Sequence, residues 1–265
     1  MNRIKRALRL VRSHGSMVES KVSHPIGERY SNEQETNYHV TKKVNVFPNV
    51  LKRNRVISTH QNDSIISAYK ILRTRVLQRM KEQGWSTLGI SSANQNEGKS
   101  LTAINLAISL AQETQHTVLL VDFDLREPSV HSYFEHIPEY GVSDYFLNDT
   151  PIEDILFNPG IDDLVVLPSI KPLSNSSEAL SSPKAIDLVN ELKNRYRDRI
   201  IIFDLPPLLN SDDVMAFSPY IDSALLVIED GKTGRDGLQQ ALNYLEKTPL
   251  LGTVLNKSGG KSQFA

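Results

Sequence analysis

The chain contains no cysteine and no long apolar run in its 265 residues. Without thiols, neither a disulfide framework nor a thiolate metal site can form, and the sequence is compatible with a reducing compartment. No run approaches the roughly 18 apolar residues of a membrane-spanning helix, and the basic residues of Met1 to Arg12 do not precede an apolar core. We therefore expect a cytoplasmic protein with neither a transmembrane helix nor a secretory signal.

The length fits one α/β domain of roughly 200 residues plus an extension. Residues 1–55 hold 12 Lys and Arg against 4 Glu, a net charge of +8, whereas the remainder holds 18 against 27, a net charge of −9. We predict a basic, largely disordered extension over 1–55, with Val44 to Leu51 docking on the body. The body spans 56–258, and 259–265 form a short tail. We expect no nucleic acid as partner.

The first twelve residues form an amphipathic pattern, with two interpretations left open. The helix could lie on an anionic membrane surface, which would make the protein peripheral at the inner face of the membrane. Alternatively, residues 1–12 are a solvated basic terminus, because a three-turn helix is marginal by itself. The apolar face holds Ile4, Ala7, Leu8 and Val11, and the basic face holds Lys5, Arg6, Arg9 and Arg12.

The stretch from Leu88 to Ala111 has the pattern of strand, tight polar loop and helix. A phosphate-binding loop needs inward backbone N–H groups, a lysine that reaches the terminal phosphates and a hydroxyl for Mg²⁺. Gly98, Lys99 and Ser100 supply these parts. Ala93 stands where the usual pattern opens with glycine. Asn96 replaces another common glycine but tolerates left-handed backbone angles, so the pattern still predicts a nucleotide site.

Two further apolar strands end in acids at Asp122, which Asp124 closely follows, and at Asp204. Carboxyl ends of parallel strands meet at one edge of a sheet, where Lys99 and Ser100 should also point. A carboxylate there can hold Mg²⁺, directly or through water. The alternative is that these acids cap turns.

The remaining pattern alternates strands with helices and predicts an α/β fold with a mostly parallel sheet and helices on both faces. A helix from about residue 62 to Gln83 should bury Ile65, Ala68 and Val76 and expose a basic face that includes Arg73. Ser174 to Ser182 is expected to be a polar loop. Other helices are expected at 129–134, 142–147, 152–157, 183–196 and 235–247, and strands at 87–91, 117–122, 163–167, 199–204, 224–228 and 251–255.

These motifs resemble those of the cytoplasmic tyrosine kinases of bacterial capsule and exopolysaccharide systems, especially the autokinases associated with exosortase loci. The resemblance covers about Asp63 to Lys257. ANQNEGKS corresponds to the family's Walker A motif, VLLVDFDLREP to Walker A′ and IIIFDLPPLL to Walker B. It implies a P-loop fold that binds ATP and Mg²⁺ and transfers the γ-phosphate to tyrosine. It also implies a membrane-bound polysaccharide chain-length (co-polymerase) protein as partner.

The resemblance also implies roles for individual residues. Lys99 would hold the phosphates, and Asp122 or Asp124 would activate the acceptor hydroxyl. Ser100 and Asp204, with Asp122 as a further candidate, would hold Mg²⁺. The nucleotide-binding set is Asn96, Glu97, Gly98, Lys99, Ser100 and Leu101.

The chain departs from the family pattern at three places. No tyrosine follows Tyr244, so the C-terminal acceptor cluster of the family is missing and the acceptor lies elsewhere or is absent. The family's interface motif Glu-x-x-Arg-x-x-Arg aligns with Ser67, Lys70 and Arg73, which leaves homo-oligomer assembly open. Asn94 stands where partition and septum-positioning ATPases carry a signature lysine.

Two alternatives to a kinase that regulates polysaccharide polymerisation and export remain at this stage. The first is a membrane-associated positioning ATPase that binds through residues 1–12; Asn94 disfavours this branch. The second is a catalytically weak, nucleotide-gated interaction module of the same pathway.

Overall fold

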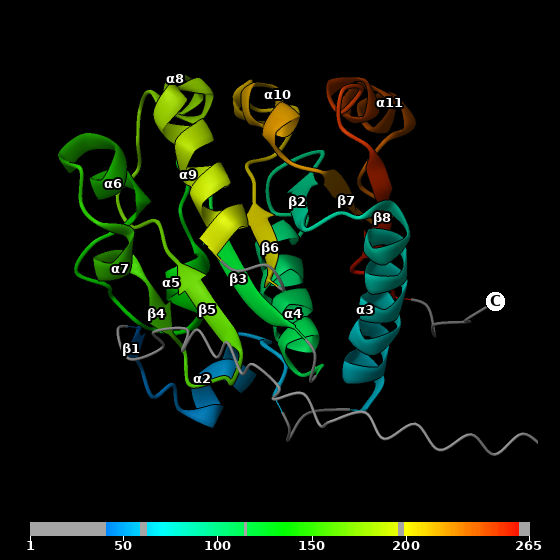
Figure 1. Cartoon of the computed structure of the whole chain (residues 1–265). Coiled ribbons are helices and arrows are strands. Elements are labelled where there is room, and N and C mark those ends of the chain that lie inside the picture. The colour runs from blue at the N-terminus through cyan, green and yellow to red at the C-terminus, as the bar shows by residue number, and fades with distance from the viewer. Residues whose placement is uncertain (1–40, 59–62, 114–115, 196–198, 260–265) are drawn as a thin grey trace, which may run out of the picture. The chain divides into compact units, whose positions relative to one another are not determined.

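The computed structural model describes residues 41–58, 63–113, 116–195 and 199–259, whose central element is an eight-stranded sheet (Figure 1). The strand order is β1-β4-β5-β3-β6-β2-β7-β8. All neighbours pair in parallel except β4 and β5. This confirms the mostly parallel α/β prediction. The strands are β1 (Lys42–Lys43), β2 (Thr87–Ser92), β3 (Thr117–Asp122), β4 (Phe157–Asn158), β5 (Leu164–Leu167), β6 (Arg199–Asp204), β7 (Ser223–Glu229) and β8 (Leu250–Asn256).

The central strands β2, β3 and β6 are buried along almost their whole length because both faces of the sheet are covered. Side chains alternate between two cores: Leu119 and Val121 of β3 pack into one, and Val118 and Leu120 into the other. One core is covered by α2 (Pro48–Arg53), α3 (Asp63–Gln83), α4 (Lys99–Ala111) and α5 (Val130–Tyr133). The other is covered by α6 (Val142–Asn148), α7 (Ile152–Ile155), α8 (Ser176–Ser181), α9 (Pro183–Arg195), α10 (Asp213–Phe217) and α11 (Arg235–Tyr244).

Part of the predicted extension belongs to the folded body. Val50 and Leu51 of α2 are buried, and so is Val56 just beyond the helix. Strand β1 pairs with β4 at one edge of the sheet. The expected docking of Val44 to Leu51 is therefore confirmed. The expected helix over residues 1–12 and the tail beyond residue 259 lie outside the described residues.

Two short helical segments on the second face were not expected. Helix α8 lies within the stretch 174–182 that the sequence indicated as a loop, and α10 continues into the 3-10 helix η2 (Ser218–Tyr220). Both segments are too short to show a repeating apolar stripe. They form because Leu180 and Phe217 are buried in the core that α9 and α11 also cover. Tertiary packing thus decided these helices.

Helix α3 differs from the amphipathic helix that the sequence predicts. Val76 and Met80 are buried as expected, but Ile65 is 48% exposed and Ala68 is exposed too. Arg73 was expected on a solvated face. Instead its guanidinium donates to the Ser109 carbonyl of α4 at 3.0 Å and also pairs with an acid near the end of that helix. The N-terminal half of α3 therefore has a partly uncovered apolar face.

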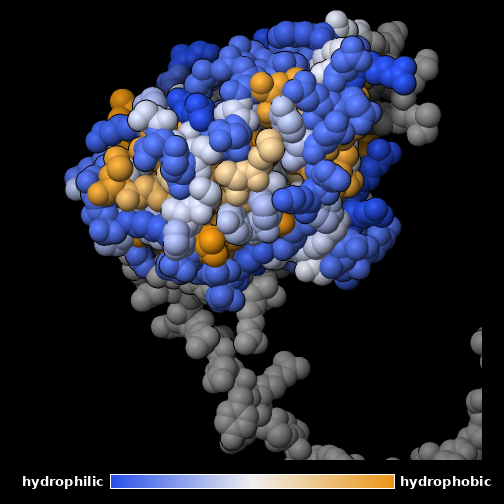
Figure 2. Space-filling model, turned by 90° about the horizontal axis from the view of Figure 1, so that it is seen from above, coloured by the Kyte–Doolittle hydropathy of each residue, from blue (hydrophilic) through white to orange (hydrophobic). Residues whose placement is uncertain are grey.

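The described surface gives no sign of a membrane-spanning element. None of the helices in the described ranges is both long and apolar enough to span a bilayer. On the face shown in Figure 2, hydrophobic residues form small separate patches among hydrophilic ones. Scattered apolar side chains are ordinary on a protein surface, so this face by itself indicates no large interface.

The docking of α2 generates a stability prediction. Leu51→Ala removes a side chain that is 8% exposed, and we expect the free energy of unfolding to fall by about 2 to 3 kcal/mol. Urea unfolding of the full chain measures this change. Phe47→Ala, at a position that is 71% exposed, is the control and should change stability by less than about 0.5 kcal/mol. Equal stability of the Leu51 variant and the wild type would show that α2 contributes nothing to folding.

Candidate active site

The loop between β2 and α4 has the backbone of an anion-binding turn. Asn96 has φ of 63° and Gly98 has φ of 96°, both in the left-handed region. The expectation that asparagine replaces glycine at 96 is thus confirmed in its geometry. Ala93 needs no glycine, because its φ lies outside that region. Helix α4 then begins at Lys99, with its free N–H groups facing the loop.

Glu97 stabilises this loop through hydrogen bonds to its carboxylate. Its carboxylate is fully buried and accepts hydrogen bonds from the Asn94 backbone N–H at 3.1 Å and from the Thr233 hydroxyl at 2.6 Å. The Asn94 side chain donates to it as well, at 3.0 Å. The sequence assigned Glu97 to nucleotide binding. Its side chain joins the loop to the segment before α11, and the assignment to nucleotide binding stays a prediction that rests on its backbone N–H.

The end of strand β8 supports the loop from another side. Asn256 donates its side-chain amide to the Glu97 carbonyl at 2.8 Å, and Lys257 donates to the Asn96 carbonyl at 2.5 Å. The backbone at Gly98 favours glycine because its φ of 96° is left-handed, and a Cβ atom there would also displace the Asn256 amide nitrogen, which would lie 2.1 Å away. Three distant segments therefore build one rigid phosphate loop.

Lys99 lies at the centre of the acidic edge of the sheet. Its ammonium donates to Asp124 at 2.7 Å and to the Ser100 hydroxyl at 3.2 Å, and lies 3.9 Å from Asp204. Burial lowers the pKa of Lys99, but the carboxylates of Asp204 and Asp124 outweigh this effect and raise it above its usual value. The lysine therefore stays charged throughout the physiological range.

The two acids that follow β3 differ in their surroundings. Asp122 is fully buried, and one of its oxygens accepts the backbone N–H groups of Ser129 and Val130 at 3.0 Å each. Asp124 accepts the Glu127 N–H at 3.1 Å with the oxygen that Lys99 does not contact. Both acids thus cap turns, as the alternative interpretation held, but Asp124 also faces an open pocket. Burial raises the pKa of Asp122 well above its usual range, and the neighbouring Asp204 carboxylate raises it further.

Asp204 is a buried carboxylate with few polar contacts. It is fully buried, it stands beside Asp122 in the β3–β6 register, and neither of its oxygens has a hydrogen-bond partner within the described part of the chain. Burial raises its pKa to about 6, although Lys99 and Ser100 act in the opposite direction. A buried carboxylate with free oxygens, close to a serine hydroxyl, is a donor set that suits a hard cation such as Mg²⁺.

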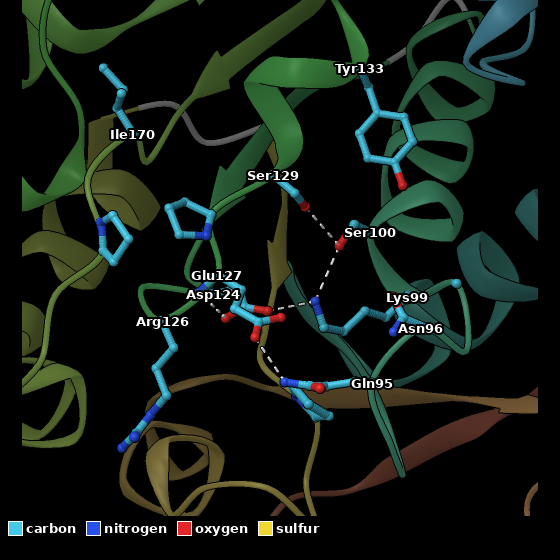
Figure 3. Close-up of a pocket in the computed structure, with 14 residues that line it drawn as sticks. Gln95, Asn96, Lys99, Ser100, Asp124, Arg126, Glu127, Ser129, Tyr133 and Ile170 are labelled. Carbon is cyan, nitrogen blue, oxygen red and sulfur yellow. Dashed lines mark hydrogen bonds and ion pairs between the residues drawn. The ribbon is translucent and has the colours of Figure 1, made fainter.

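A pocket of about 490 Å³ opens above the loop and is large enough for a small-molecule ligand (Figure 3). Lys99, Ser100 and Asp124 come together on its walls, as predicted, while Leu101 packs toward the core. Glu97, Asp122 and Asp204 are buried beneath this surface. The other walls come from Gln95, Asn96, Gly98, Arg126, Glu127, Pro128, Ser129, Tyr133, Ile170, Pro172 and Pro207.

Comparison with known proteins agrees with this geometry. A family model described as an AAA domain matches residues 88–255. Tyrosine-protein kinase YwqD of Bacillus subtilis is 32% identical over 208 residues, which are 78% of this chain and 86% of the relative. The chain belongs to the bacterial tyrosine-protein kinases.

Other members of the family are similarly close. Tyrosine-protein kinase CpsD of Streptococcus agalactiae is 30% identical over 192 residues, 71% of this chain and 82% of CpsD. The crystal structure of the chimerical protein CapA2B2 superposes with a TM-score of 0.71 at 25% identity, covering 83% of this chain and 94% of that one. The P-loop fold and the family that the motifs predict are therefore confirmed.

Several residues of this tyrosine-kinase site could not be found from local motifs. Arg126 lines the pocket and makes a bidentate contact to the two oxygens of the buried Asp213 of α10, at 2.8 and 3.2 Å. Tyr133 reaches the pocket from α5. Asn256 and Lys257 could have been suspected, because they follow a strand whose carboxyl end meets the same edge. For Arg126 and Tyr133 the sequence carries no such signal.

The burial of Asp204 generates a prediction about pH. Its pKa is raised to about 6 in the fold, so the free energy of unfolding is highest below the unfolded pKa and falls as pH rises through about 4 to 6. Asp204→Asn removes this loss. At pH 7.5, without ligand, we expect the variant to be more stable than wild type by up to about 3 kcal/mol, and at pH 4 about equally stable.

Thermal and urea unfolding across this pH range measure the difference. Asp212→Asn, at a side chain that is 71% exposed, is the matched control for the loss of one carboxylate. A less stable Asp204 variant at pH 7.5 would contradict the prediction, because it would mean that the carboxylate stabilises the fold.

Proposed function

We propose that this member of the family is an ATP-dependent protein-tyrosine kinase whose phosphate site is built around Lys99. The observation that supports this most strongly is the position of the lysine. It lies at the start of α4, in an open pocket, 2.7 Å from a carboxylate and 3.2 Å from a serine hydroxyl. An ammonium, a helix N-terminus and a rigid amide loop together form a binding site for a polyphosphate.

Nucleotide binding then requires an exchange of partners at Lys99. Without ligand, Asp124 neutralises the Lys99 ammonium. The Lys99 side chain is part of the pocket wall and is only 11% exposed. A phosphate offers the same charge with more acceptor oxygens, so Lys99 turns from Asp124 to the phosphate. The exchange frees one Asp124 oxygen in the same pocket. That oxygen becomes available as a base for an incoming hydroxyl group.

Ser100 and Asp204 are the residues that would hold Mg²⁺, and the bound ion would neutralise part of the phosphate charge. Ser100 lines the pocket, and the buried Asp204 has oxygens without a hydrogen-bond partner in the described part of the chain. Asp122 has a different role in this proposal. It caps α5 through two backbone N–H groups and so positions the segment that follows.

The transfer step depends on positioning and on charge neutralisation. An acceptor tyrosine loses its proton to Asp124, its oxygen attacks the γ-phosphorus, and the bond to the bridging oxygen of the β-phosphate breaks to release ADP. Lys99 stabilises the charge on the phosphoryl oxygens. The rigid loop needs no rearrangement for this step, since Glu97 and Asn256 already fix it.

The wider role rests on the family resemblance. We propose that the kinase regulates polymerisation and export of an exopolysaccharide or capsule, in the cytoplasm and next to the inner face of the membrane. Its partner would be a membrane-bound chain-length protein of the co-polymerase kind. Residues 1–12 would add a weak contact to anionic lipid, since each basic side chain near such a surface contributes about 1 kcal/mol.

The decisive experiment is incubation of purified full-length protein with MgATP, followed by mass spectrometry for phosphotyrosine and by a hydrolysis assay. Phosphotyrosine that forms only with MgATP supports the kinase. ATP-dependent binding to anionic liposomes without phosphotyrosine would support the positioning ATPase instead. ATP binding without phosphotyrosine or hydrolysis would indicate a nucleotide-gated interaction module.

The lysine carries a prediction of its own. A charge-assisted contact contributes roughly 1.5 to 3 kcal/mol, so Lys99→Met should weaken ATP binding at least about tenfold in calorimetry. The rise in melting temperature that saturating MgATP causes in wild type should shrink accordingly. Lys70→Met, the same change at an exposed position of α3, is the control. Unchanged affinity in the Lys99 variant would refute the assignment of the phosphate loop.

A further inference from the structure

The proposed base, Asp124, belongs to neither a strand nor a helix. It lies two residues beyond the end of β3, in the connection to α5. A carboxylate that takes a proton from an incoming hydroxyl must lie within hydrogen-bond reach of it, and a shift of about 1 Å can reduce the rate about a hundredfold. Because no regular backbone ladder holds this connection, the position of the carboxylate depends on the contacts of its neighbours.

One hydrogen bond orients the Asp124 carboxylate once ATP is bound. In the free protein, one of its oxygens lies 2.7 Å from the Lys99 ammonium, and the other accepts the Glu127 N–H at 3.1 Å. In the proposed reaction Lys99 turns to the phosphates, so the first contact is lost. Of the two contacts, the bond from the Glu127 N–H then remains. The position of that N–H is set by the residue before it, Arg126.

Arg126 is anchored to the buried start of α10. Its guanidinium donates to both oxygens of Asp213, at 2.8 and 3.2 Å, and approaches Asp212 at 3.7 Å. Asp213 is fully buried, whereas the Asp212 side chain is 71% exposed. The Arg126 side chain lines the pocket, but Figure 3 shows its guanidinium turned away from Lys99. The arginine therefore fixes the Asp124 connection to the body of the protein.

The charge balance keeps this anchor in place when a nucleotide binds. Arg126 lines the pocket, so its guanidinium could turn to a phosphate instead. No other ion pair or hydrogen bond to the Asp213 carboxylate is found within the described ranges. Turning away would leave a fully buried carboxylate without a counter-ion, which costs more than a contact in an open pocket returns. Arg126 therefore stays with Asp213, and Lys99 is the cation that changes partner.

Helix α10 holds the same connection at a second point, on the other side of Asp124. The ring of Phe217 packs edge-to-face against that of Phe123, with centroids 4.9 Å apart. Asp213 and Phe217 are four residues apart on α10 and thus project from the same face of the helix. One short helix therefore contacts the residue before Asp124 and the residue two positions after it.

We infer that Asp213 is a positioning residue for phosphoryl transfer. Acting through Arg126, it fixes the Glu127 N–H and so orients the base Asp124. This rests on the proposed function and adds to it the residue that holds the base in place. Asp213 does not line the pocket, and the phosphate loop with Lys99 is fixed by other segments. Its effect is therefore on the rate of transfer and not on the affinity for ATP.

The test compares two amide substitutions one residue apart in the full-length protein. Asp213→Asn removes the charge and one acceptor from the pair with Arg126 at nearly constant volume. At saturating MgATP and fixed protein concentration, we expect the rate of phosphotyrosine formation to fall at least about tenfold. Asp212→Asn, the same change at the exposed neighbour, is the control and should keep the rate within about twofold of wild type.

Calorimetry of MgATP binding separates positioning from a general loss of structure. We expect the dissociation constant of Asp213→Asn to stay within about threefold of wild type, because Lys99 and its loop do not depend on α10. A damaged fold would weaken ATP binding together with transfer. Urea unfolding of the same samples reports how much stability the substitution removes.

A second variant keeps the buried charge compensated. Arg126→Lys leaves a cation beside Asp213 but replaces the two-pronged guanidinium contact by a single ammonium. It therefore stays informative even if Asp213→Asn folds poorly. We expect transfer to slow at least about fivefold with ATP affinity unchanged, because an ammonium does not fix the direction of the chain. Transfer by Arg126→Lys at the wild-type rate would overturn the inference.

The double variant tests whether the two residues act along one path. Independent effects on the rate multiply. Since Asp213 acts through Arg126, we expect the variant with both changes to transfer phosphate at about the rate of the slower single variant. A loss equal to the product of the two single losses would overturn the shared path.

The outcomes separate this inference from the proposed function. Phosphotyrosine that forms at the wild-type rate in Asp213→Asn would overturn the positioning role and leave the kinase intact. ATP binding and transfer that weaken together would show a purely structural residue and would overturn the role as well. Absence of phosphotyrosine in wild type would overturn the proposed function and, with it, the role of Asp213.

Discussion

The structure depends on how negative charge is balanced at the carboxyl edge of a parallel sheet. The register of β3 and β6 places Asp122 directly beside Asp204, and both are fully buried. Two carboxylates in a medium of low dielectric repel each other and lose their hydration, so the folded state needs a compensating cation. Lys99 supplies it. The ammonium, which ends up near three acids, is therefore a structural element of the free protein as well as the expected phosphate ligand.

Without ligand, the negative charge at this edge is only partly compensated, which leaves groups free to bind a nucleotide and a cation. Asp204 has no hydrogen-bond partner for either oxygen within the described ranges, and Lys99 contacts Asp124 in place of a phosphate. Binding of a cation and a polyphosphate would satisfy both sites together. The loop backbone does not have to move, because Glu97 and Asn256 fix it. The protein thus accepts a lower stability in the free state to have a preorganised site.

The N-terminal segment is connected to the same edge. Asn54, at the end of α2, holds the Tyr133 carbonyl, and Arg53 forms an ion pair with Glu135 two residues further on. The basic segment therefore does more than extend the chain, since its last part fixes the short helix that closes the pocket.

The sequence by itself determined the local chemistry. Apolar runs that end in acids and a Gly-Lys-Ser turn before an apolar helix predicted the parallel sheet, the position of Lys99 and the common edge of Asp122, Asp124 and Asp204, because such patterns need only neighbouring residues. Tertiary structure decided what depends on contacts between distant segments. These are the hydrogen bonds from Asn256 and Lys257 to the loop, the docking of α2, and the short helices that form only when packed. It also decided which acid faces the pocket: Asp124, two residues beyond the end of β3, lines the pocket, whereas Asp122 and Asp204 at the ends of β3 and β6 do not.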